Sequence, residues 1–159
     1  DFLRNDWEPI ICATKNGKLP WSDNTAMGHK PVVKGARTAT NREKSGKRKS
    51  VQYNDPEISN PGNIIHGVVG KGNLGWGDAH ENEAPFPQWL AKFVVKGLCP
   101  PGGVGLDPFS GSGTTVAASV AARRSAVGVD IRESQTWLAE TRMMGLRVKQ
   151  RQQGQKVLI

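Results

Sequence analysis

The chain has few of the residues that build covalent or metal-bound scaffolds. Its 159 residues include two cysteines, Cys12 and Cys99, which lie far apart and in no CxxC arrangement. A disulfide-rich scaffold is therefore excluded, no metal site is expected, and a reducing, cytoplasmic compartment is the simplest one. No run approaches the ~18 consecutive apolar residues of a membrane helix, and no secretory signal pattern opens the chain. We therefore expect no contact with a membrane.

Acidic residues are almost missing from residues 30–49. The chain carries a formal net charge of +8, and this stretch accounts for nearly all of the excess. Its only acid is Glu43, whereas its cations are Lys30, Lys34, Arg37, Arg42, Lys44, Lys47, Arg48 and Lys49. Since residues 38–50 also have no apolar face, we expect a loop or linker that only an acidic partner would order. Composition alone favours a solvated loop over contact with a polyanion.

The chain is organised around residues 104–115, Val-Gly-Leu-Asp-Pro-Phe-Ser-Gly-Ser-Gly-Thr-Thr. The apolar start predicts a strand that ends at Asp107, and the two glycines precede a small-residue helix expected over 114–122. A second strand, predicted over 125–130, ends in Asp130 about twenty residues beyond the glycine loop. This order predicts a βαβ unit that presents backbone N–H groups and two carboxylates to a nucleotide-like ligand.

Apolar runs elsewhere predict further elements. Strands are expected over 8–14 and 63–69, and an apolar stripe between Pro87 and Gly97 predicts a helix. An amphipathic helix is expected over 133–144. Its inward residues are expected to be Trp137, Leu138, Thr141 and Met144.

The glycine loop lacks the marks of two common nucleotide sites. A P-loop needs a Lys before the hydroxyl residue, but Gly113 is followed directly by Thr114, which argues against a triphosphate. A dinucleotide fingerprint needs a third glycine where Val116 stands, which disfavours a nicotinamide oxidoreductase. Two acids and two close glycines suit a ligand with an amino-acid end and a ribose. S-adenosylmethionine has that chemistry.

Residues 107–115, Asp-Pro-Phe-Ser-Gly-Ser-Gly-Thr-Thr, resemble motif I of the DNA amino-methyltransferases, the N4-cytosine and N6-adenine enzymes. Residues 84–90, Ala-Pro-Phe-Pro-Gln-Trp-Leu, are similar to motif X of that family. Motif X directly before motif I near the C-terminus is the permutation of the β class, whose catalytic motif IV comes first. The resemblance implies an α/β chain with part of the Rossmann-like fold of S-adenosylmethionine-dependent methyltransferases and a basic, loop-rich insertion. It also implies a bacterial or phage restriction-modification setting.

The same resemblance implies which residues hold the cofactor. Motif I would line the methionine end of S-adenosylmethionine, motif X would close over that end, and the acid after the second strand would take the ribose hydroxyls. The residues so placed are Asp107, Phe109, Ser110, Gly111, Gly113 and Thr114 from motif I, Phe86 and Pro87 from motif X, and Asp130.

The catalytic tetrapeptide of that family, Asp/Ser/Asn-Pro-Pro-aromatic, occurs nowhere in the 159 residues. Methylation of an exocyclic amine requires a flipped base whose amino group is held in line with the sulfonium methyl. The chain also begins with Asp1 rather than Met. The hypothesis is therefore the C-terminal part of a site-specific DNA methyltransferase, inactive by itself, whose catalytic motif lies in an upstream part of the same protein.

Within this resemblance the basic stretch occupies the place of the target-recognition region. Contact with phosphates of double-stranded DNA is then expected from Lys44, Lys47, Arg48 and Lys49. The expected division is an early strand with the recognition region over 1–79, the cofactor-binding region over 80–146, and a basic, Gln-rich frayed tail over 147–159. A non-catalytic DNA-binding protein with a nucleotide-type fold remains the main alternative.

Overall fold

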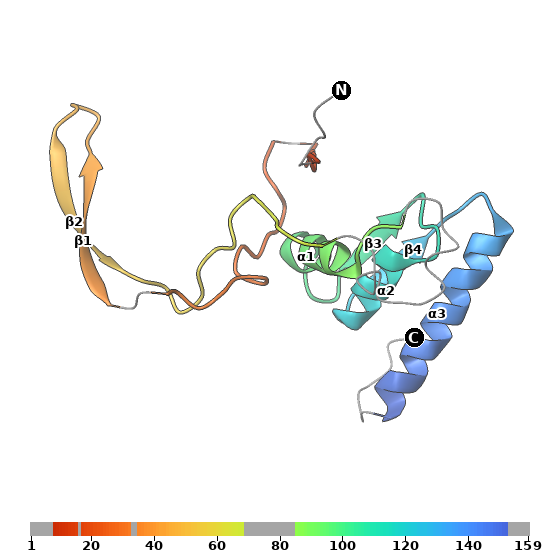
Figure 1. Cartoon of the computed structure of the whole chain (residues 1–159). Coiled ribbons are helices and arrows are strands. Elements are labelled where there is room, and N and C mark those ends of the chain that lie inside the picture. Colours follow the sequence, from red (N-terminus) through yellow and green to blue (C-terminus); the bar gives the residue numbers. More distant parts are fainter. Residues whose placement is uncertain (1–7, 16, 33–34, 69–84, 153–159) are drawn as a thin grey trace, which may run out of the picture.

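The computed structural model describes residues 8–15, 17–32, 35–68 and 85–152. It contains a β-hairpin, formed by β1 (Ala36–Arg42) and β2 (Arg48–Asn54), and an α/β unit that begins at α1 (Gln88–Leu98). Figure 1 shows the hairpin standing apart from the α/β unit, with irregular segments between them. The glycine loop and the basic stretch thus belong to two different parts of the fold.

The α/β unit follows the predicted strand, helix, strand order. β3 (Val104–Asp107) leads through the glycine loop into α2 (Thr114–Ala121), which returns to β4 (Ser125–Gly128). β3 and β4 are parallel neighbours, with Leu106 opposite Val127. The βαβ prediction is confirmed, and with it the α/β class.

Small side chains allow α1 and α2 to pack closely. The core between them consists of Ala91 and Val95 from α1 with Ala118 and Ala122 from α2 and its C-cap, all of them buried. α2 also packs against both strands, so α1, α2 and the strand pair follow one another as layers. This stack fixes the two ends of the loop between β3 and α2.

The two faces of the strand pair differ in chemistry. The face toward α2 is lined by small residues, since a Cβ added at Gly105 would lie 3.4 Å from Ser119 Oγ and one at Gly128 2.8 Å from Val116 Cγ2. The opposite face is apolar and exposed, with Val104 at 66%, Leu106 at 68%, Val127 at 52% and Val129 at 53%. Parallel sheets are normally buried on both faces. This apolar face therefore has the character of an interior surface.

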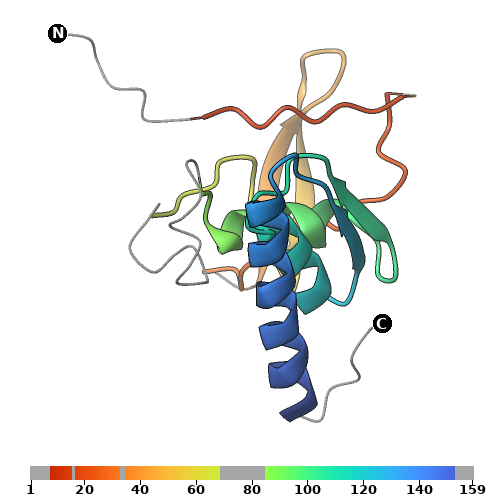
Figure 2. The same ribbon diagram turned by 90° about the vertical axis from the view of Figure 1, so that its right-hand side faces the viewer.

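The helix that follows β4 differs from the prediction in length and in orientation. α3 (Glu133–Gln152) continues through residues 147–152, which were expected to be a frayed tail, and it extends past the other elements of the unit in Figure 2. Residues 153–159 lie outside the described part of the chain. Leu138 is buried as predicted, but Trp137 and Met144 are each 64% exposed and Thr141 is exposed. Two polar residues, Gln135 and Arg142, are buried instead.

The basic stretch is ordered, contrary to the expectation of a loop. β1 and β2 pair in an antiparallel register that sets Arg37 opposite Tyr53 and Thr38 opposite Gln52. Gln52 Nε2 donates a hydrogen bond to Thr38 Oγ1 at 3.2 Å, and the Arg37 guanidinium lies over the Tyr53 ring, 5.5 Å from its centroid. These cross-strand contacts stabilise a ribbon that has no apolar face.

The strands predicted over 8–14 and 63–69 are wrong. Residues 8–14 and 63–68 have no regular secondary structure, and Val69 lies outside the described residues. Ile11 is 87% exposed and Ile64 is 70% exposed. The end of the second run instead contacts Trp89 of α1, whose Nε1 donates to Val68 O at 3.4 Å. An apolar run forms a strand only where another strand can pair with it.

Candidate functional site

The glycine loop is built from backbone hydrogen bonds. Ser110 N donates to Val129 O at 2.8 Å, which joins the loop to the residue after β4. Gly113 N donates to Ser110 O at 2.8 Å and closes the turn into α2. Phe109 N donates to Asp107 Oδ1 at 3.1 Å, so this carboxylate shapes the turn directly after β3.

Asp130 ties the middle of the loop to the end of β4. Its Oδ2 accepts a hydrogen bond from Gly111 N at 2.9 Å, and its Oδ1 accepts from Arg132 N at 3.0 Å and Arg132 Nε at 3.4 Å. The Arg132 N–H, followed by the Gly111 N–H and the Arg132 guanidinium, holds the pKa of Asp130 below its ordinary value of 3.8, although desolvation opposes this. The carboxylate is therefore ionised at neutral pH.

Two glycines allow the loop to approach its neighbours. Gly113, the N-cap of α2, has a φ of +78°, and a Cβ there would lie 2.9 Å from Ala139 Cβ on α3. A Cβ on Gly128 would lie 2.9 Å from Ser110 Cβ. Any larger residue at either position would push the loop out of place. Gly128 was not predicted as a site residue, since its role depends on the tertiary contact with Ser110.

A buried cation lies behind the loop. Arg142 of α3 is 4% exposed, and its Nη1 donates to Thr114 Oγ1 at 3.0 Å and to Ser112 O at 3.4 Å. Burial lowers the pKa of Arg142, but a guanidinium remains protonated in proteins. The sequence analysis did not single out Arg142. Its spacing of four residues from Leu138, which puts both on one helix face, was the available signal.

A pocket of about 740 Å³ opens beside the loop. This volume is typical of small-molecule sites, which range over about 300–1,000 Å³. The predicted cofactor residues that line it are Phe86, Phe109, Ser110, Gly111, Thr114 and Asp130. The lining residues that were not predicted are Pro85, Pro108, Val129, Ile131 and Arg132. Strand, loop and motif X thus meet around one cavity.

Three predicted cofactor residues lie outside the pocket lining. Asp107 accepts the hydrogen bond of the turn, Gly113 caps α2, and Pro87 is the N-cap of α1. In this structure all three shape the elements that surround the pocket.

The pocket combines apolar and charged surfaces. Phe109 and Ile131, which are 87% and 99% exposed, flank it with apolar side chains, whereas Asp130 and Arg132 supply opposite charges. Thr114, the first residue of α2, also lines it, and that helix has no side-chain N-cap. The N–H groups of an uncapped first turn favour a carboxylate. The pocket can therefore take a ligand with an acidic end, hydroxyl groups and a flat apolar part.

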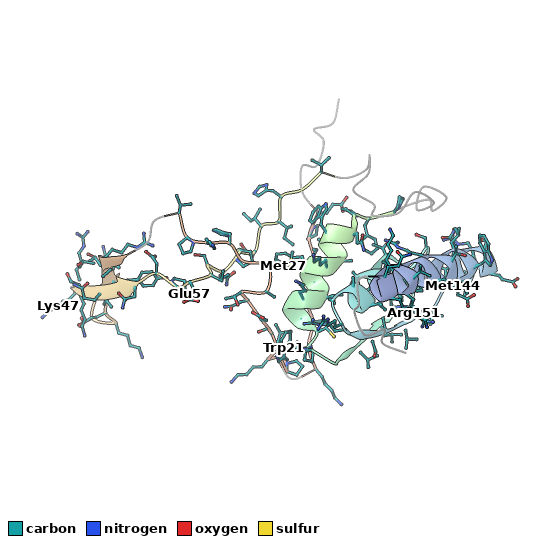
Figure 3. All side chains as sticks on the ribbon, turned by 90° about the horizontal axis from the view of Figure 1, so that it is seen from below. Trp21, Met27, Lys47, Glu57, Met144 and Arg151 are labelled. Carbon is teal, nitrogen blue, oxygen red and sulfur yellow. The ribbon has the colours of Figure 1, made fainter. Side chains whose placement is uncertain are left out.

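The four residues expected to bind DNA do not form one patch. Lys44 and Lys47 lie in the tip of the hairpin, and Lys47 marks its outer end in Figure 3. Arg48 pairs with Arg42 and Lys49 pairs with Asn41. Because successive residues of a strand point to opposite faces, Arg48 and Lys49 lie on opposite sides of the ribbon.

The described part of the chain holds neither a metal-ligand cluster nor a membrane-spanning helix. No group of three or more His, Cys, Asp or Glu side chains there could hold a metal ion. Among the described helices, none has the length and apolar character needed to cross a membrane.

Residues 1–141 match the family described as DNA methylase, N6_N4_Mtase. A 60-residue region is 42% identical to the Type II methyltransferase M.ScaI of Streptomyces caespitosus, covering 38% of this chain and 20% of that protein. The M1.HpyAVI–SAM complex is similar over 39% of this chain and 32% of its own, with 26% identity and a TM-score of 0.38. The cytosine-N4-specific PvuII DNA methyltransferase is similar over 50% of this chain and 29% of its own, with 21% identity and a TM-score of 0.39. The matched regions thus span less than a third of each of these relatives.

Proposed function

Because this chain belongs to the DNA methylase family, we propose that it is the cofactor-binding part of an enzyme that methylates an exocyclic amino group in DNA. The acceptor would be cytosine N4 or adenine N6. Family membership confirms the recognition based on motifs I and X, the Rossmann-like fold class, and S-adenosylmethionine as the cofactor of the family. When bound, this cofactor supplies the methyl group from its sulfonium.

The pocket beside the glycine loop is the observation that carries the proposal. Asp130 uses two acceptor positions on Oδ1 and one on Oδ2 within the protein. A carboxylate offers about four acceptor positions, so one remains on Oδ2 for a ribose hydroxyl. The uncapped N-terminus of α2 at Thr114 suits the carboxylate of the methionine end. The exposed rings and side chains of Phe109 and Ile131 offer apolar contacts to a purine.

The residues that hold the loop would position the cofactor before it binds. Asp130 and Arg142 fix the loop from two sides through contacts made entirely within the chain. A loop that is already ordered loses little conformational freedom on binding, which favours affinity. In this proposal the six predicted residues that line the pocket contact the cofactor directly. Asp107, Gly113 and Pro87 act indirectly, by shaping the elements that surround the pocket.

The residues that act on the target base lie, in this proposal, in polypeptide beyond residues 1–159. The chain has no Asp/Ser/Asn-Pro-Pro-aromatic tetrapeptide. The exposed apolar face of β3 and β4, which carries Leu106 and Val127, has the chemistry of a surface covered by a further layer. A second layer of the same enzyme packed there would bring a catalytic tetrapeptide into one fold with the cofactor pocket. Lys44, Lys47, Arg48 and Lys49 would then contact DNA.

Calorimetry on the intact protein tests the cofactor site. We expect binding of S-adenosylmethionine and none of NAD, and we expect Asp130→Ala to weaken binding roughly tenfold or more. Asp107→Ala should weaken it through loss of the turn. Asp23→Ala is the matched control, because the Asp23 carboxylate accepts hydrogen bonds from Thr25 and neither residue lines the pocket.

Two outcomes would overturn the proposal. If NAD binds and S-adenosylmethionine does not, the ligand assignment is wrong. If the intact protein binds S-adenosylmethionine but transfers no labelled methyl group to a duplex pool of all sequences, the non-catalytic alternative replaces the enzyme.

A further inference from the structure

We propose that the β1–β2 hairpin reads the base sequence of DNA with one of its two faces, placed in the major groove. This hydroxyl–arginine face is formed by Thr38, Thr40, Arg42, Arg48, Ser50 and Gln52. The inference rests on the proposed function for the identity of the partner, double-stranded DNA. It goes beyond phosphate contact because it divides the cations of the hairpin into separate roles.

The register of the hairpin defines the two faces. Directly paired residues of an antiparallel ribbon point to the same side, and successive residues alternate. The printed pairs Thr38–Gln52, Thr40–Ser50 and Arg42–Arg48 therefore share one face. The other, which we call the tyrosine face, carries Arg37, Ala39, Asn41, Lys49, Val51 and Tyr53.

The main cation of the tyrosine face is already occupied within the protein. Arg37 forms an ion pair with Asp55, whose side chain is 5% exposed, and its guanidinium lies over the Tyr53 ring. Breaking this pair to contact DNA would leave a buried carboxylate without its cation, which is costly. The tyrosine face is therefore organised by its own contacts.

On the hydroxyl–arginine face, by contrast, the cations repel each other. Arg42 and Arg48 lie directly opposite each other, and like charges at paired positions destabilise a ribbon. No carboxylate of the described residues forms an ion pair with either guanidinium. The neighbouring acid, Glu43, accepts a hydrogen bond from Ser45 Oγ instead. An electron-rich partner, such as the O6 and N7 edge of guanine, would relieve this repulsion.

The remaining groups on this face match the polar edges of bases. Arginine pairs with guanine, glutamine with adenine, and serine or threonine with either, and the major groove admits a two-stranded β-ribbon. Strands of seven residues at about 3.3 Å per residue span roughly 20 Å, or about six base pairs at 3.4 Å each. Lys44 and Lys47 at the tip would reach phosphates at the groove edge.

Arg48 and Lys49 provide a matched test, because they are adjacent, equally charged, and on opposite faces. The intact protein is used to select bound duplexes from a random DNA pool, which are then sequenced. We expect Arg48→Gln to lose base preference by roughly tenfold at one or more positions. Lys49→Gln should keep the wild-type preference and weaken all sequences alike. Arg42→Gln should relax preference at positions next to those affected by Arg48→Gln.

The readout is binding, so it separates this inference from the proposed function. A preference that depends on Arg48 in a protein that transfers no methyl group would support the inference and refute the enzyme. Methyl transfer with equal effects of the Arg48 and Lys49 variants would refute the face assignment alone. Loss of preference in Lys49→Gln but not in Arg48→Gln would show that the tyrosine face reads the bases. Folding of the Arg48 variant is not at risk, because it removes a repulsion.

Discussion

Replacement of Gly128 by alanine should destabilise the protein through the glycine loop. Gly128 ends β4 opposite Asp107, and a Cβ there would lie 2.8 Å from Val116 Cγ2 and 2.9 Å from Ser110 Cβ. The valine methyl can turn away, but Ser110 Cβ is attached to the backbone of the loop. Overpacking of this kind costs about 1–3 kcal/mol. The reduced freedom of the unfolded chain offsets about 0.4–1 kcal/mol of it.

Gly105→Ala is the matched control in the neighbouring strand. A Cβ on Gly105 would lie 3.4 Å from Ser119 Oγ and 4.0 Å from Ser125 O, which are ordinary contacts. This substitution should therefore only reduce the conformational freedom of the unfolded chain, which stabilises the protein by about 0.4–1 kcal/mol. Gly128→Ala should instead lose about 1.3 kcal/mol in total, from the middle of the two ranges. The same chemical change thus has opposite signs in two adjacent strands.

Urea denaturation of the intact protein measures both free energies of unfolding, with an unchanged m-value as the check for two-state behaviour. Calorimetry with S-adenosylmethionine should also show weaker binding to Gly128→Ala, because Ser110 lines the pocket, and unchanged binding to Gly105→Ala. Equal signs for the two variants would refute the packing argument. Normal cofactor affinity in a destabilised Gly128 variant would show that Ser110 moves without disturbing the pocket.

Two further predictions concern the charged groups around the loop. A double-mutant cycle of Arg142→Met and Thr114→Val should give a coupling free energy of about 1–2 kcal/mol, since the two side chains share a buried, charged hydrogen bond. As a control on the same helix, Arg147→Met at an exposed position should change the free energy of unfolding by less than about 0.5 kcal/mol. The pKa of Asp130 is lower in the folded protein than its ordinary value of 3.8. The stabilising contribution of this carboxylate should therefore be complete above pH 3.8 and be lost as the pH falls through the pKa of the folded state. Comparison of unfolding free energies of wild type and Asp130→Asn across acidic pH checks this, and a difference that changes between about pH 5 and 7 would contradict it.

The βαβ region around the glycine loop could be predicted from the sequence because its signals are local. Strand, glycine loop, helix and strand follow one another within residues 104–128, and Asp130 stands where the spacing placed it. The carboxylate bonds the loop at Gly111, a contact between residues nineteen apart in the chain that the βαβ geometry creates. Ile131 and Arg132 were missed, although they follow the predicted acid directly and share its position at the pocket.

Elements governed by long-range or polar contacts could not be predicted in the same way. The buried side of α3 was predicted from the spacing of apolar residues, which placed Trp137 inward. The side that is buried in the structure includes the polar Arg142, which bonds to Thr114. The hairpin was missed because its pairing relies on Arg37–Tyr53 and Thr38–Gln52 contacts, which no periodicity of apolar residues reveals. Polar pairing across strands depends on register, and register is a property of the folded ribbon.

In the α/β unit, the polar contacts determine the shape of the loop, whereas the apolar face of the strands affects the overall stability. The side chains of Asp107, Asp130 and Arg142, which fix the loop, find their hydrogen-bond partners within the unit itself. The apolar face that carries Leu106 and Val127 is more than half exposed, and such a face is stable in water only at a cost in hydrophobic free energy. The geometry of the loop should therefore be kept without the proposed second layer, whereas the free energy of unfolding should be lower without it. On this reasoning, packing of a second layer would raise stability far more than it would reshape the pocket.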